Sequence, residues 1–259
     1  MSGSAAREIL AGAEYVQQIT ALASDRRARV AFQELVLRIA PPGGALFDFG
    51  AGPGIDARFY AERGFAVAAY DVDPKMREFF VVHCRDLIDA GRVTLDGGTY
   101  QEFLVRKSVG GGRRVDLVTS NFAVLNLVPD LQELFANLHA LTAPHGKVLA
   151  SVLSPYFVGD LKYGWWWRNA LRLWRDGQFS VPGAQAPIVR RRLANYAAHS
   201  VPYFTLERVF RGLPAQRRQT GDDGETSRGR RHAWLRATTS RFMFLLFARR
   251  DPPVSGSPG

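Results

Sequence analysis

The chain has 259 residues, of which 46% are apolar and 12% aromatic, so it is long enough to bury one sizeable core. Its single cysteine, Cys84, excludes an internal disulfide, and no apolar run approaches the roughly 20 residues of a membrane span. The first residues contain no apolar signal core, and we expect a soluble, cytoplasmic protein with one domain over residues 1–250.

The formal charge of +10 is concentrated in the second half of the chain. Residues 156–250 contain 18 Lys and Arg against 6 Asp and Glu, whereas residues 1–155 are nearly neutral. Such an excess suits an anionic partner, which would be a phosphate group, a nucleic acid or a membrane surface. It suits equally well the solvated arginines of a protein from a GC-rich genome, so charge alone leaves both interpretations open.

The N-terminal part of the chain has helical periodicity. Apolar residues at helical spacing over residues 5–39 predict two helices, which divide near residues 23–25. Ser24 or Asp25 would cap the second helix, and the Pro-Pro-Gly-Gly run at residues 41–44 would end it. We therefore assign residues 1–42 to an N-terminal helical segment.

Strand and helix patterns alternate from residue 45 to residue 153, with short connections between them. Strands are predicted at residues 45–49, 66–70, 93–95, 115–120 and 147–153, and helices at 55–63, 74–90 and 131–141. This alternation predicts an α/β fold with a doubly wound, mostly parallel sheet and helices on both faces.

The pattern changes beyond Ser154. Residues 155–200 are rich in aromatic and basic side chains, including the run Trp165-Trp166-Trp167, and predict a helical, aromatic insertion after the fifth strand. Residues 201–250 return to regular structure and end in an apolar strand at 241–248, which would bring the sheet to seven strands. Residues 216–232 have no apolar face and predict a long mobile loop, and 251–259 predict a flexible tail.

The most informative segment joins the first strand to its helix. It carries Gly50, Gly52 and Gly54 at alternate positions, where glycine permits a positive φ and lets a ligand approach the main chain. Asp71 ends the second strand about 20 residues later, where a carboxylate can accept ribose hydroxyl protons. The G-x-G-x-G spacing leaves no obvious pyrophosphate cradle, which favours a nucleoside ligand and disfavours an NAD-dependent oxidoreductase.

Four segments in order resemble the motifs of the class I, Rossmann-like S-adenosylmethionine-dependent methyltransferases. They are Phe47–Gly54, Tyr70–Met76, Asp116–Phe122 and Leu141–Leu149, followed by the C-terminal strand at 241–248. The resemblance implies that residues 45–153 form a core binding S-adenosylmethionine and that 201–250 complete the sheet. From its aromatic and basic residues we expect 155–200 to form a substrate cap. No metal is expected.

The resemblance also implies a set of cofactor-binding residues. They are Tyr15, Asp48, Phe49, Gly50, Ala51, Gly52, Gly54, Asp71, Val72, Met76, Thr99, Tyr100, Asn121 and Phe122. The glycine turn would face the methionine part, with Asp48 organising the turn from beneath.

Asp71 would hold the ribose, Val72 and Met76 would pack on the adenine, and Asn121 and Phe122 would lie by the transferred methyl group. Tyr15 would close over the cofactor.

The sequence departs from the family pattern after the third strand, where an acid commonly contacts the adenine amino group. Thr99 occupies that position, and Thr99 and Tyr100 would supply hydroxyl and backbone atoms instead. Purely structural roles remain open for several of the implied residues. Asp71 would alternatively cap the helix that begins at Pro74, and Asn121 would alternatively satisfy loop backbone.

A general base is needed only if the methyl acceptor is a hydroxyl or a protonated amine. The catalytic candidates are His199, Tyr203 and Tyr156, which lie on the part of the chain expected to return across the mouth of the site. A packed or surface histidine is the alternative for His199.

The acceptor is predicted to be a small or lipid-linked molecule, anionic or hydrophobic in character. The segment Trp165–Trp174 has Trp and Arg at helical spacing, and would roof a hydrophobic pocket, contact a membrane surface or simply pack on the sheet. An RNA methyltransferase that uses the basic second half is the first alternative. A non-catalytic cofactor-binding protein of the same fold is the second. The oligomeric state is left open.

Overall fold

The computed structural model describes residues 23–154, 157–162, 164, 166–167, 175, 178–181, 188–211 and 240–250, without the side chains of 178–181 and 188–190. The helix predicted before residue 23, the loop predicted at 216–232 and the tail at 251–259 lie outside these residues. Tyr15, Tyr156 and most of the segment Trp165–Trp174 also lie outside them. None of the helices in the described part combines the length and apolar character that a membrane crossing requires.

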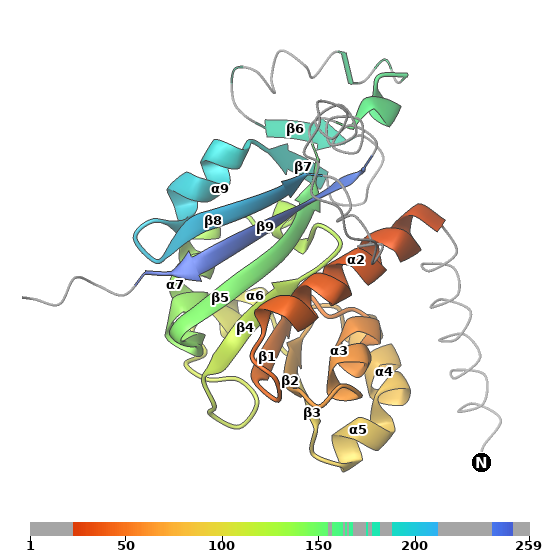
Figure 1. The fold of residues 1–259 in the computed structure, drawn as a ribbon, viewed down its shortest axis with the longest axis vertical. Coiled ribbons are helices and arrows are strands. Elements are labelled where there is room, and N and C mark those ends of the chain that lie inside the picture. The colour runs from red at the N-terminus through yellow and green to blue at the C-terminus, as the bar shows by residue number, and fades with distance from the viewer. Residues whose placement is uncertain are drawn as a thin grey trace, which may run out of the picture.

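A seven-stranded sheet forms the centre of the fold, with the strand order β3-β2-β1-β4-β5-β9-β8 (Figure 1). Its strands are β1 (Ala45–Phe49), β2 (Ala66–Tyr70), β3 (Val93–Asp96), β4 (Val115–Ser120), β5 (Thr142–Leu153), β8 (Phe204–Arg211) and β9 (Phe242–Arg249). The first five strands are mutually parallel, and β9 runs antiparallel to both of its neighbours. The predicted doubly wound, mostly parallel sheet of seven strands is therefore confirmed.

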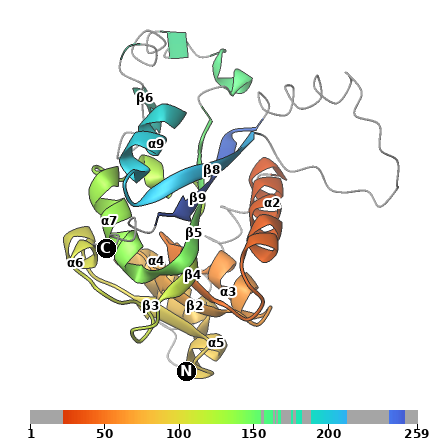
Figure 2. The ribbon, with the colours of Figure 1, turned by 60° about the vertical axis from the view of Figure 1, so that its left-hand side comes forward.

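Helices cover both faces of this sheet (Figure 2). One apolar layer packs α2 (Ala23–Ile39), α3 (Ile55–Ala61), α4 (Pro74–His83) and α5 (Arg85–Asp89) against the sheet. The other packs α6 (Tyr100–Leu104), α7 (Leu131–Leu141) and α9 (Leu193–Ser200) on the opposite face. Because both faces are covered, the central strands are buried almost throughout, which explains their continuous apolar runs.

Several element boundaries differ from the sequence-based prediction. The helix predicted over 74–90 is divided at Cys84 into α4 and α5, and β5 begins at Thr142 rather than at residue 147. Asp73 caps α4, since its carboxylate accepts the Lys75 N–H at 2.9 Å. The short helix α6 and the helix α9 were not predicted.

Smaller elements complete the described part of the chain. They are the 3-10 turns η1 (Val124–Asn126) and η2 (Val158–Asp160) and the antiparallel strand pair β6 (Gln178–Val181) and β7 (Ile188–Arg191). Trp167 lies beyond η2 with 61% of its surface exposed, and its indole N–H donates to the Leu161 carbonyl at 2.8 Å.

Candidate functional site

The carboxyl ends of β1, β2 and β4 meet at one edge of the sheet, where the strand order reverses. β1 lies between β2 and β4, so the chain leaves β1 toward one side of the sheet and later returns on the other. Ligands of open α/β sheets bind in the crevice outside such a reversal point. The glycine turn, Asp71 and Asn121 each follow one of these three strands, so the fold brings them to the same edge.

The glycine turn is held in shape by the end of β2. The N–H groups of Gly50 and Ala51 both donate to the Tyr70 carbonyl, at 2.8 and 3.0 Å. Gly50, Gly52 and Gly54 have φ values of 75°, 55° and 82°, which only glycine adopts readily. The alternate glycines are thus required by the backbone conformation of the turn.

The three glycines differ in what surrounds them. A Cβ atom on Gly50 would lie 2.6 Å from the Val124 side chain, and one on Gly54 would lie 2.7 Å from the Phe80 ring and 2.8 Å from the Cys84 sulfur. A Cβ atom on Gly52 would meet nothing within 4 Å. The turn therefore packs its two outer glycines against the protein and presents Gly52 to open space, which is the arrangement a cradle for a ligand requires.

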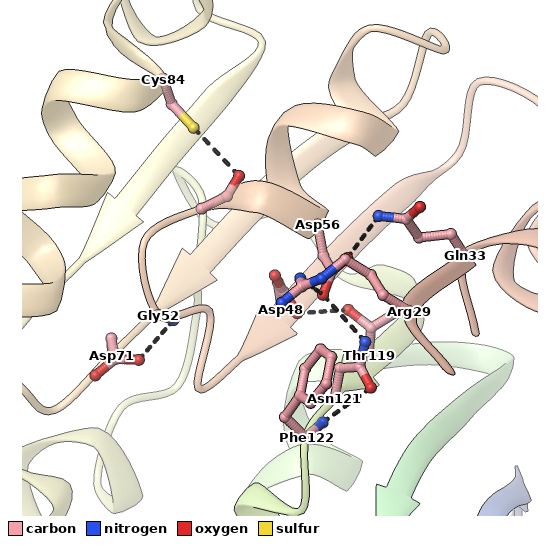
Figure 3. Close-up of polar contacts among 11 residues, drawn as sticks. Arg29, Gln33, Asp48, Gly52, Asp56, Asp71, Cys84, Thr119, Asn121 and Phe122 are labelled. Carbon is pink, nitrogen blue, oxygen red and sulfur yellow. Dashed lines mark hydrogen bonds and ion pairs between the residues drawn. The ribbon is translucent and has the colours of Figure 1, made fainter. Parts of the chain in front are cut away.

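Asp71 connects the end of β2 to this turn. One carboxylate oxygen accepts the Gly52 N–H at 2.7 Å (Figure 3). The other oxygen accepts the Asp73 N–H at 2.9 Å. Burial raises the pKa of Asp71, and these two backbone N–H groups oppose that rise. Each oxygen accepts one of these bonds and retains a further lone pair, so the carboxylate has acceptor capacity for a ligand that approaches Gly52.

A second group of polar side chains lies buried behind the turn, and Figure 3 shows its members facing one another. Asp48 on β1 accepts the Thr119 hydroxyl at 2.9 Å. Its other oxygen, Oδ2, is buried without a hydrogen-bond partner among the described residues. Burial raises the pKa of Asp48 to about 7, and the negative charge of Asp56 adds to that rise. Asp48 is thus buried near the carboxyl end of β1, one residue before the strand ends and the glycine turn begins.

Asn121 and Phe122 follow β4 at the same edge. The Asn121 amide nitrogen donates to Asp56 at 3.1 Å, and its amide oxygen accepts the Phe122 N–H at 2.8 Å. The Asn121 side chain is therefore turned into the protein. Phe122 is half-buried, with Arg29 4.3 Å from its ring centroid and the Phe242 ring edge-on at 5.5 Å.

The residues predicted to bind the adenine differ from one another in exposure and in the contacts that they make. Val72 is 54% exposed and Met76 is half-buried, so both are accessible. The Thr99 hydroxyl accepts the Glu102 N–H at 3.2 Å, because Thr99 caps α6. The Tyr100 ring packs toward Phe103 on the α6 and α7 side of the sheet.

Phe49 likewise points into the core, where its ring stacks on Tyr70 at 5.9 Å, which leaves its backbone as the part available to a ligand. Ala51 is half-buried and packs on the layer formed by α2 to α5.

The structure does not bring Tyr203 to this edge. Tyr203 precedes β8, whose first residue pairs with Arg249, and its carbonyl accepts the Arg250 N–H at 2.8 Å. Because β9 is antiparallel to β5, Arg249 lies at the amino end of the parallel strands and Phe242 at the carboxyl end. Tyr203 therefore lies at the opposite end of the sheet from the glycine turn. His199 is in the last turn of α9, which leads directly to this distant end.

Sequence reasoning missed Arg29, Gln33 and Asp56. Asp56 is 5% exposed although it lies on a short helix, and Gln33 is buried on α2 between apolar residues. The signal that would have found them is a polar residue at a helix position that should face the core, since buried polar groups are paired with one another.

Comparison with known proteins agrees with this geometry. The sequence profile of a methyltransferase domain matches residues 22–199, which is more than half of the chain. The chain is a class I S-adenosylmethionine-dependent methyltransferase. S-adenosylmethionine is therefore the methyl donor of this enzyme, and the cofactor, enzyme class and family predicted from the sequence are confirmed.

Solved structures share the fold of this methyltransferase at low sequence identity. An S-adenosylmethionine-dependent methyltransferase from Mesorhizobium loti has 17% identity and a TM-score of 0.57 over 85% of this chain and 98% of its own. The 1,6-didemethyltoxoflavin-N1-methyltransferase of Burkholderia thailandensis has 18% identity and a TM-score of 0.55, over 97% and 92%.

The geranyl diphosphate C-methyltransferase of Streptomyces coelicolor has 15% identity and a TM-score of 0.52, over 85% of this chain and 78% of its own. A search of curated protein sequences found no significant match.

Proposed function

We propose that this methyltransferase transfers the methyl group to a small molecule that binds beside Phe122, with the cofactor held by the glycine turn and by Asp71. The observation that carries the proposal is the open space at Gly52 next to a buried carboxylate. An adenosyl ligand carries two ribose hydroxyl donors, and Asp71 offers the matching acceptors at the end of β2.

The residues of the site fit this cofactor. When bound, S-adenosylmethionine supplies a methyl group that its positively charged sulfur activates for displacement. Asp71 would accept the ribose hydroxyls, the face of the turn at Gly52 would contact the methionine part, and the exposed Val72 side chain would cover the adenine.

Alignment of the two reactants is the contribution we assign to Phe122. Its ring is fixed by Arg29 on one side and Phe242 on another, so it offers a rigid apolar wall beside the glycine turn. Holding an acceptor in line with the methyl group converts a bimolecular step into an effectively unimolecular one. A wall of this kind suits an aromatic or otherwise apolar acceptor.

The class of acceptor draws support from two of the structural relatives. One is a 1,6-didemethyltoxoflavin-N1-methyltransferase and the other is a geranyl diphosphate C-methyltransferase, and both of these acceptors are small molecules. Their low identity to this chain transfers the fold and not the substrate, so the acceptor must be tested directly.

Calorimetric titration with S-adenosylhomocysteine tests the cofactor site. Asp71→Ala should weaken its binding by about 10- to 100-fold, because charge-assisted hydrogen bonds to the ribose are lost. Asp73→Ala is the matched control, since Asp73 caps α4 and lies two residues after Asp71 in the chain. Equal affinity of Asp71→Ala and the wild type would remove Asp71 from the site.

Transfer of a radioactive methyl group to defined acceptors tests the substrate class. The panel contains small aromatic heterocycles, prenyl diphosphates, lipid-linked molecules in vesicles, and RNA. Labelling of a small molecule that is reduced in Phe122→Ala supports the proposal. Labelling of RNA alone, with a steep dependence on salt, would replace it with the RNA alternative.

A further inference from the structure

Asp56 occupies an unusual position for a carboxylate. It lies in the first turn of α3, directly after the glycine turn, and its side chain is buried. Three side chains donate to it: Arg29 at 2.7 Å, Gln33 at 2.7 Å and Asn121 at 3.1 Å (Figure 3). These donors come from α2 and from the end of β4, so one carboxylate joins three separate elements behind the turn.

The bond to Asn121 fixes the backbone that follows β4. With its amide nitrogen on Asp56, the Asn121 side chain directs its oxygen toward the Phe122 N–H, at 2.8 Å. Phe122 and Ala123 have φ values of 54° and 64°, a left-handed conformation that costs energy for residues other than glycine. Such a turn persists only where its surroundings hold it, and Asn121 supplies one of the bonds that do so.

The turn after β4 contacts the glycine turn directly. Val124, which follows Ala123, packs against Gly50 so closely that a Cβ atom there would lie 2.6 Å from it. Arg29, the ion-pair partner of Asp56, also lies over the Phe122 ring. A displacement of Asp56 would therefore reach the cofactor cradle through Val124 and the acceptor wall through Phe122.

We propose that Asp56 is the positioning residue of the methyl-transfer site, which sets the Asn121–Val124 turn against the glycine turn without itself contacting the cofactor or the acceptor. The inference rests on the proposed cofactor site. In this proposal α2 helps to shape the site, because Arg29 and Gln33 on that helix orient the Asp56 carboxylate. The shape of the cradle is then set by contacts between α2, α3 and the end of β4.

The charge of Asp56 provides a readout that a role in folding alone would not move. Asp48 faces Asp56, Thr119, Arg29 and Asp71, and the negative charge of Asp56 contributes to its raised pKa. Replacement of Asp56 by Asn keeps the side-chain size and removes that charge. The pH at which Asp48 ionises should then fall, and with it the midpoint of any pH dependence of cofactor affinity.

The test is calorimetric binding of S-adenosylhomocysteine to the full chain across pH, with the wild type and Asp56→Asn. We expect Asp56→Asn to bind about tenfold more weakly or worse, with its pH midpoint moved to lower pH. Asp86→Asn is the matched control, because Asp86 pairs with Arg58 of α3 at the exposed surface, at 2.7 Å. We expect its affinity and midpoint to equal those of the wild type.

A double-mutant cycle separates positioning through Asn121 from a general loss of structure. If Asp56 acts through Asn121, Asp56→Asn should weaken binding much less in an Asn121→Ala background than in the wild type. If Asp56→Asn does not fold, Arg29→Lys is tested in its place. This variant keeps the positive charge and loses the planar contact with Phe122, so it should also weaken S-adenosylhomocysteine binding.

Normal binding by the wild type together with unchanged affinity and midpoint in Asp56→Asn, or in Arg29→Lys in its place, would overturn the inference. Absence of binding by the wild type would instead refute the proposed cofactor site.

Discussion

Replacement of Asp48 by Asn should make the protein more stable at neutral and alkaline pH. Asp48 is 2% exposed, has an Oδ2 atom without a partner among the described residues, and lies close to the charge of Asp56. A carboxylate in this position is costly when ionised, because burial removes its hydration. Asn has the same shape, can accept the Thr119 hydroxyl with its amide oxygen, and carries no charge.

The size of the effect follows from the pKa. In the unfolded chain Asp48 ionises near 3.8, whereas in the folded protein burial raises its pKa to about 7. Between these values the folded state binds one more proton than the unfolded state, so the stability contributed by Asp48 falls as pH rises through this window. Each pH unit is worth about 1.4 kcal/mol, so from about pH 5 to pH 7 the wild type should lose roughly 3 kcal/mol that Asp48→Asn retains.

Urea unfolding at a series of pH values measures this difference directly. Subtraction of the two stability profiles removes the contribution of every other group that titrates alike in both proteins. The difference should grow from about pH 4 to pH 7 and then stay constant. Parallel stability profiles over this range would show that the pKa of Asp48 is not raised in the folded protein, and would refute the reasoning from its burial.

Three further predictions concern groups whose surroundings differ. Gly52→Ala should cost about 1–2 kcal/mol of stability because of its positive φ, and should abolish S-adenosylhomocysteine binding. Gly54→Ala should lose more stability because Phe80 and Cys84 pack against it. Denaturation and calorimetry measure the two effects, and a larger loss of stability in Gly52→Ala than in Gly54→Ala would contradict this prediction. Cys84 is buried, which raises its thiol pKa to about 12, so a disulfide reagent should label it only on unfolding; rapid native labelling would argue against its burial. Tyr203→Phe should leave cofactor affinity and methyl transfer unchanged, and a loss of turnover alone would place its hydroxyl in the reaction.

The sequence was sufficient for the features that depend on local chemistry. The central strands could be recognised from continuous apolar runs, because both faces of the sheet are covered. The turn could be recognised from its alternate glycines, because its backbone has a positive φ at each of them. Asp71 could be placed beside the turn because the carboxyl ends of parallel strands meet at one edge of a sheet.

The features that the sequence did not reveal depend on long-range packing. Asp56 is bound by residues 23 to 65 positions away, so a polar residue at a core-facing helix position indicates that it has a partner but does not identify that partner. Tyr203 was expected at the mouth of the site because it follows the insertion. The chain instead passes through α9 to the amino ends of the parallel strands before β8 begins, and β8 then runs in the same direction as β5 because both are antiparallel to β9. The orientation of the Tyr100 ring toward the core was not predicted, because α6, whose first residue is Tyr100, was itself not predicted.

The direction of β9 has a consequence for how this enzyme can vary. The end of β5 and the start of β9 lie side by side, since Leu153 pairs with Phe242, and β8 ends beside Met243 at the same edge. Both long connections, from β5 to β8 and from β8 to β9, therefore depart from the reaction edge of the sheet next to Phe122. For an acceptor bound beside Phe122, as proposed, exchange or lengthening of either connection would change acceptor choice while the part built from β1 to β4 keeps its geometry.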